Sequence, residues 1–121
     1  MEMILSSTRR PDITFHDTGE IYITSRIARI LHLSGESCVN VARHEGEYLL
    51  VAENYTNMIG SHTARCHVVN AGSRYFRANS VVLCRAMLSA CGAVGKAALM
   101  CGEPITLKGK TCLPIITRIT L

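Results

Sequence analysis

The segment His62 to His67 holds the side chains best suited to metal chemistry, with two imidazoles and the thiol of Cys66. Imidazole nitrogen and thiolate sulfur are the ligands that Zn²⁺ prefers. The segment contains no Cys-x-x-Cys pair, however, and neighbouring side chains of a strand point to opposite faces, so Cys66 and His67 would diverge. The sequence therefore predicts no metal site and no cofactor.

Catalytic chemistry has equally weak candidates. A cysteine nucleophile needs an exposed, electropositive thiol with an imidazole in reach. Five of the six cysteines lie in the second half of the chain among small and aliphatic residues, where a free thiol behaves as a buried hydrophobe. Glu45 and Glu47 flank a turn glycine and are most simply solvated. We expect no catalytic residue and no enzymatic activity. The cysteines are Cys38, Cys66, Cys84, Cys91, Cys101 and Cys112.

The 121 residues suit a single domain, 1–121, with an aliphatic core, because 48% of them are apolar and Trp is absent. No stretch reaches the roughly 18 apolar residues of a membrane span. The start of the chain lacks the apolar run of a secretory signal. These features predict a cytoplasmic protein with reduced thiols and no membrane contact.

The first half reads as a sequence of strand, turn, strand, helix, strand and strand. β-like runs surround the turn Asp17 to Glu20, and Ser25 is placed to cap a helix that ends at Ser34-Gly35. Two further runs, about 38–41 and 48–52, flank the turn His44 to Glu47.

The second half repeats this order around Gly72. A strand over 66–69 precedes the turn, a helix over about 79–90 ends at Cys91-Gly92, and later strands are joined by a hairpin at Lys108-Gly109-Lys110. The sequence thus predicts an α+β fold: a small closed β-barrel from two pseudo-twofold-related ββαββ units, about 13–53 and 66–119, each with one short helix.

Charge is divided unequally between the halves. Residues 1–64 carry five Arg and eight acidic residues, for a net charge of −3, whereas residues 65–121 carry eight basic residues and one acid, for a net charge of +7. The two halves could simply attract each other. A basic half can also face phosphates, and arginine suits planar recognition of phosphates and base edges.

The stretch Gly19 to Leu33, with its turn glycine, alternating strand and short helix ending in Leu-x-Leu, resembles the SpoVT/AbrB-like family of swapped-hairpin DNA-binding domains. The resemblance extends to Val51 without a gap and implies a DNA-binding barrel. Two departures stand out: the family usually has Pro where Thr24 stands, and Arg where Glu20 stands. Because Glu20 would repel phosphate, the resemblance points to the second unit as the DNA contact.

Two functions from different classes follow. One is a transcriptional regulator or antitoxin-like protein that binds double-stranded DNA. The other is a protein-interaction or structural module, with a protein partner or self-association, that has lost DNA binding. A continuous basic face would favour the first and scattered charges the second. The candidate DNA-binding residues are Arg29, Arg74, Arg77, Arg85, Lys108 and Lys110.

Overall fold

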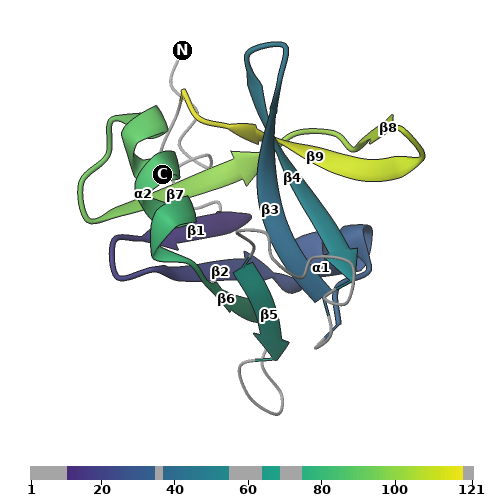
Figure 1. The fold of residues 1–121 in the computed structure, drawn as a ribbon, viewed down its shortest axis with the longest axis horizontal. Coiled ribbons are helices and arrows are strands. Elements are labelled where there is room, and N and C mark those ends of the chain that lie inside the picture. Colours follow the sequence, from purple (N-terminus) through teal and green to yellow (C-terminus); the bar gives the residue numbers. More distant parts are fainter. Residues whose placement is uncertain (1–10, 35–36, 55–63, 69–74, 119–121) are drawn as a thin grey trace, which may run out of the picture.

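The computed structural model describes residues 11–34, 37–54, 64–68 and 75–118 (Figure 1). In that part of the chain, nine strands and two helices follow one another. In chain order they are β1 (Ile13–His16), β2 (Glu20–Thr24), α1 (Ser25–Leu31), β3 (Ser37–His44), β4 (Glu47–Asn54), β5 (Ala64–Val68), β6 (Tyr75–Asn79), α2 (Val81–Cys91), β7 (Lys96–Cys101), β8 (Ile105–Leu107) and β9 (Lys110–Ile116).

The strands form one antiparallel sheet that curls into a half-barrel (Figure 1). Their order is β4-β3-β5-β6-β2-β1-β7-β9-β8, and β4 also pairs with β9, where Tyr48 lies opposite Ile115 and Leu50 opposite Leu113. Neighbours in the sheet are therefore often distant in the chain. β1 pairs with β7, β2 with β6 and β3 with β5.

The core lies on the concave side of the curled sheet and is built from alternate strand residues. In β1 and β2, Ile13, Phe15, Ile21 and Ile23 are buried, and the residues between them are only partly covered. This alternation follows from the two-residue period of a strand, which gives one apolar and one polar face. Buried residues of the other elements complete the cluster, among them Ile27, Val39, Leu50, Ala78, Met87, Leu99 and Leu113.

Both helices are short and end at a left-handed residue. The prediction of a helix near each of these positions is confirmed, and so is Gly92 as the end of α2. Ser80 caps α2 by accepting a hydrogen bond from the backbone N–H of Leu83 at 3.1 Å. In α1 the capping residue is Thr24 rather than Ser25, and the helix ends at His32 rather than at Ser34. In the described part of the chain, neither helix has the length and apolar character needed to cross a membrane.

The prediction of a small closed β-barrel from two pseudo-twofold-related ββαββ units is wrong. The structure is a mostly antiparallel β sheet with two helices, curled as a half-barrel, and its second half has three strands after the helix instead of two. The extra strand forms because Lys108-Gly109 closes a tight hairpin that pairs β8 with β9. Strands of the two halves alternate in pairs along this one sheet.

The carboxylate of Asp12 joins three elements at one corner of the sheet. Its oxygens accept hydrogen bonds from Arg26 of α1 at 3.0 Å and from the backbone N–H of Cys101 at the end of β7 at 2.8 Å. The backbone of Asp12 bonds to Leu99 and to Thr24. Asp12 is buried, so these donors offset the cost of removing its charge from water. The N–H of Thr24 donates to Asp12, and a proline at this position would lose that bond.

Gly19 allows the β1–β2 turn to lie directly against the start of α2. Its φ of +102° is a conformation that L side chains rarely adopt, and a Cβ there would lie 2.8 Å from Cγ2 of Val81. The carbonyl of Gly19 also accepts a hydrogen bond from the N–H of Ser80 at 2.8 Å. A side chain at this position would therefore separate the turn from the helix.

We expect Gly19→Ala to destabilise the protein by at least about 1 kcal/mol more than Gly95→Ala, because only Gly19 adds a steric clash to the backbone strain. Gly95 is the matched control: its φ is +84°, and nothing lies within 4 Å of an added Cβ. Urea unfolding of both variants measures the difference. Equal losses of stability would show that the contact with Val81 is unimportant.

Candidate functional site

The outward face of the sheet carries a row of side chains across four strands. In this row Ala98 of β7 lies opposite Thr14 of β1, Thr14 opposite Tyr22 of β2, and Tyr22 opposite Arg77 of β6. Their neighbours along each strand point into the core, so the row lies on the opposite face of the sheet. Arg77 is exposed.

Further polar residues lie one step along the same strands. His16 pairs with Lys96, and Glu20 pairs with Asn79. Lys96 and Asn79 are exposed, whereas His16 and Glu20 are partly covered. Together with the row, they form a polar face on β7, β1, β2 and β6, which we call the polar sheet face. It comprises Thr14, His16, Glu20, Tyr22, Arg77, Asn79 and Lys96.

The side chains at the centre of the polar sheet face hold one another in place. The Tyr22 hydroxyl donates to Oε2 of Glu20 at 2.5 Å, and the rings of Tyr22 and His16 meet edge to face with centroids 5.0 Å apart. Glu20, the acid that departs from the pattern of the resembled family, is thus engaged by a neighbouring hydroxyl. Arg77 lies beside Tyr22 and presents a guanidinium to solvent, so the face offers a cation, an amide and aromatic edges to a ligand.

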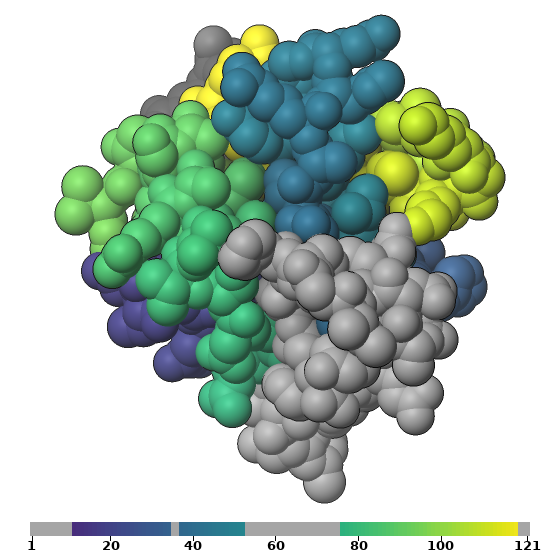
Figure 2. Space-filling view, in the orientation of Figure 1, coloured from purple at the N-terminus to yellow at the C-terminus, as the bar shows by residue number. Residues whose placement is uncertain are grey.

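Of the six predicted DNA-binding residues, the five that the structure describes do not form one surface. Arg77 lies on the polar sheet face, and Arg29 and Arg85 are exposed on α1 and α2, which follow β2 and β6 at opposite ends of this strand pair. Lys108 and Lys110 lie on the β8–β9 hairpin, on the side of the molecule opposite α2 (Figures 1 and 2). Arg74 lies outside the described residues.

Sequence reasoning missed most of the polar sheet face. Tyr22, His16, Asn79 and Lys96 were not expected to belong to a site. Their positions between buried strand residues were a usable signal, because the residue that alternates with a core residue must face away from the core. The sequence does not show which strands lie side by side, because β1 pairs with β7 across more than seventy residues of chain.

Three of the described cysteines have thiols that lose their protons less readily than a free cysteine. Burial raises the pKa of the Cys84 thiol to about 11 and that of Cys101 to about 12, the latter with a further contribution from the nearby charge of Asp12. Burial also raises the pKa of Cys91. Such thiols stay protonated and are poor nucleophiles.

Among the residues that the structure describes, no group of three or more His, Cys, Asp or Glu is placed to hold a metal ion. The side chains of Cys66 and His67 are not among those described.

Alkaline pH should destabilise the protein through these thiols. In the folded chain Cys84 and Cys101 keep their protons above the ordinary thiol pKa of 9.0, where the unfolded chain loses them. The folded state then binds more protons, so the free energy of unfolding should fall as pH rises from about 9 to about 11. Denaturant titrations should show a shallower fall for Cys84→Ala/Cys101→Ala than for wild type. Parallel pH profiles for the two proteins would contradict this assignment.

No family model matches the sequence, and no curated protein or solved structure matches it.

Proposed function

We propose that this protein binds double-stranded DNA as a transcriptional regulator or antitoxin-like protein, with the polar sheet face as its contact surface. The observation that carries the proposal is the exposed Arg77 on β6, the strand at one edge of that face, where it lies beside Tyr22. A guanidinium can bind a phosphate or a guanine edge in bidentate fashion, and β-strand surfaces are a known means of reading DNA grooves.

Three further features agree with DNA as the ligand. Asn79 lies next to Arg77 on the outward side of β6, and a side-chain amide can pair with an adenine edge. Lys96 adds a second cation, and the whole chain carries a net charge of +4. The stretch from Gly19 to Val51 resembles a DNA-binding family. The β8–β9 lysines are not part of this proposed surface, because their hairpin lies elsewhere on the molecule.

Arg77→Ala should weaken binding to a mixed-sequence duplex and reduce the slope of log affinity against log salt by about 1, because one phosphate-neutralising charge is lost. Fluorescence anisotropy over a range of salt concentrations measures both quantities. Arg43→Ala is the matched control: it removes the same charge from an exposed position of β3, away from the polar sheet face, and should leave the slope unchanged. A wild-type protein that binds no duplex at low salt would end the proposal.

A second candidate function is a protein-interaction module, favoured by the exposed surface of α2 and the loop after it. Val81 and Val82 are 44% and 65% exposed, and Val94 is 97% exposed. Ala86 and Ala90 are exposed on the same helix, where Arg85 supplies the single charge. Val81 and Val82 begin the helix and Val94 follows its end, so these groups run along its length, and exposed apolar groups commonly mark sites of protein contact. The two surfaces share no residue, so substitutions can be made in one at a time.

Val82→Asp/Val94→Asp should abolish capture of a protein partner if α2 is the contact, because burying either carboxylate carries a large desolvation cost. The measurement is a pull-down with the purified chain, followed by titration of any partner recovered. Arg77→Ala is the control and should retain full capture. If the double-aspartate variant binds the partner as wild type does, α2 is not the interaction surface.

A further inference from the structure

The ladder between β4 and β9 stops one residue short of the ends of the two strands. Its last pair is Tyr48 with Ile115, and the next pair, Glu47 with Ile116, does not form. Both residues still belong to the sheet, because Glu47 pairs with β3 and Ile116 pairs with β7. The tip of the β3–β4 hairpin and the end of β9 therefore separate, and a groove opens between them.

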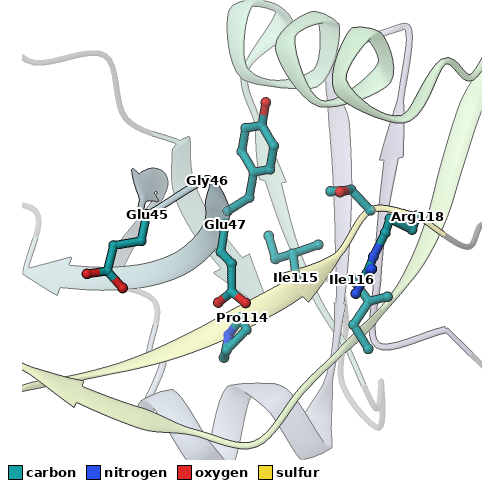
Figure 3. Close-up of a pocket in the computed structure, with 9 residues that line it drawn as sticks. Glu45, Gly46, Glu47, Pro114, Ile115, Ile116 and Arg118 are labelled. Atoms are coloured by element: carbon teal, nitrogen blue, oxygen red, sulfur yellow. The ribbon is translucent and has the colours of Figure 1, made fainter.

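The groove has walls of opposite charge. Its volume is about 370 Å³, at the lower end of the range for sites that take small molecules. Figure 3 shows the carboxylates of Glu45 and Glu47 on one side and Arg118 on the other, with Pro114 and Ile115 between them. All three charged residues are exposed. The groove thus has an acidic wall, a basic wall and an apolar floor.

Strand alternation places Glu47 and part of the apolar floor on one face of the sheet. Leu49 lies opposite Pro114, so these two side chains share a face. Glu47 is two residues from Leu49, and Ile116 is two residues from Pro114, so both share that face as well. Pro114 is partly buried and Ile116 is 38% exposed, which leaves apolar surface open beside the carboxylate of Glu47.

A second arginine near the hairpin tip does not line the groove. Arg43 pairs with Tyr48, and its guanidinium lies over the Tyr48 ring, 5.6 Å from the centroid. Tyr48 follows Glu47 in β4, so these two side chains point to opposite faces of the strand. Arg43 is therefore engaged by an aromatic ring on the other face. The cation that faces Glu47 across the groove is Arg118.

The charged walls of the groove do not neutralise each other. Within the described part of the chain, none of the side chains of Glu45, Glu47 and Arg118 forms an ion pair or a hydrogen bond. Carboxylates attract an ammonium group, and a guanidinium binds a carboxylate through two parallel hydrogen bonds. A ligand with a single charge would be repelled by one wall. A ligand that carries one charge of each sign satisfies both walls.

We infer that this groove binds a short zwitterionic peptide of two or three residues. Its free ammonium end lies at Glu45 and Glu47, its free carboxylate end lies at Arg118, and an apolar side chain between them packs on Pro114 and Ile116. The inference goes beyond the proposed DNA contact and does not depend on it, since it uses no residue of the polar sheet face.

The spacing of the walls favours a peptide over a single amino acid. If the ladder continued, Arg118 would be the diagonal neighbour of Glu47, at about 7–8 Å. The strands separate here, so the charged groups of the ligand must be well apart. Two or three extended residues span about 7–10 Å, whereas an amino acid carries both charges on one carbon.

Blocking one end of a peptide at a time tests the site. The probe is alanyl-leucyl-alanine with free ends, and its N-acetyl and C-amide forms each lack one charge. In NMR titrations of ¹⁵N-labelled protein, the free peptide should shift the amide signals of Gly46 and Ile116. Acetylation and amidation should each raise the dissociation constant about 5-fold or more, because each removes a charged hydrogen-bonding group. Leucine should also bind about 5-fold or more weakly than the tripeptide, because it cannot reach both walls.

Removing charges from the protein should reproduce these losses. Glu45→Gln/Glu47→Gln should weaken binding of the free peptide about 5-fold or more, and acetylation should then cost no further affinity. Arg118→Gln should do the same for amidation. All three residues are exposed, so these substitutions leave the core intact. Asp17→Asn and Arg77→Gln are the matched controls: each removes an exposed charge that does not line the groove, and both should bind as wild type does.

Several results would overturn the inference. One is wild-type protein whose groove amides do not shift at millimolar peptide. Others are blocked peptides or leucine that bind as tightly as the free tripeptide. A last one is acetylation that costs the double-glutamine variant as much affinity as it costs wild type, since the ammonium end would then lie elsewhere.

Discussion

The buried carboxylate of Asp12 is the interaction on which the arrangement of this sheet most depends. It lies where β1 begins, receives Arg26 from the helix after β2, and binds the backbone at the end of β7. These elements are distant in sequence, and the carboxylate fixes their register together with the alternating aliphatic side chains. A buried charge is costly unless its donors are in place, so the carboxylate favours the one alignment that satisfies it. Next to this corner, Ile13 of β1 lies opposite Leu99 of β7, and this pairing defines the register of the two strands.

That alignment decides which side chains become neighbours on the outside of the sheet. With Ile13, Phe15, Ile21 and Ile23 held in the core, the residues between them must face outward. A shift of β2 by one residue would reverse the two faces, exposing its isoleucines and burying Tyr22. The polar sheet face and the core are thus two results of the same register. Any ligand that binds there relies on the packing of the other face.

The tips of the β3–β4 and β8–β9 hairpins depend differently on the local sequence and on the whole fold. Each tip is determined locally, by a glycine that accepts positive φ and by flanking residues that form strands. Their charges act only at the scale of the whole molecule, because the direction in which each hairpin leaves the sheet decides what it can meet. The sequence alone places Lys108 and Lys110 among the candidate DNA-binding residues. In the fold their hairpin lies on the side of the molecule opposite α2, away from Arg77.

The sequence by itself determined the local elements: the turn at Gly19, both helices, the end of α2 at Gly92 and the two tight hairpins. Short-range signals sufficed there, since backbone preferences and strand alternation act over a few residues. Tertiary structure alone decided that the strands join in one half-barrel sheet rather than in a closed barrel of two ββαββ units. It also decided that Arg77 lies with Tyr22 while the lysines lie elsewhere. The local alternation shows which residues face the core but not which distant strands pair, because that depends on packing across the core and on one buried carboxylate.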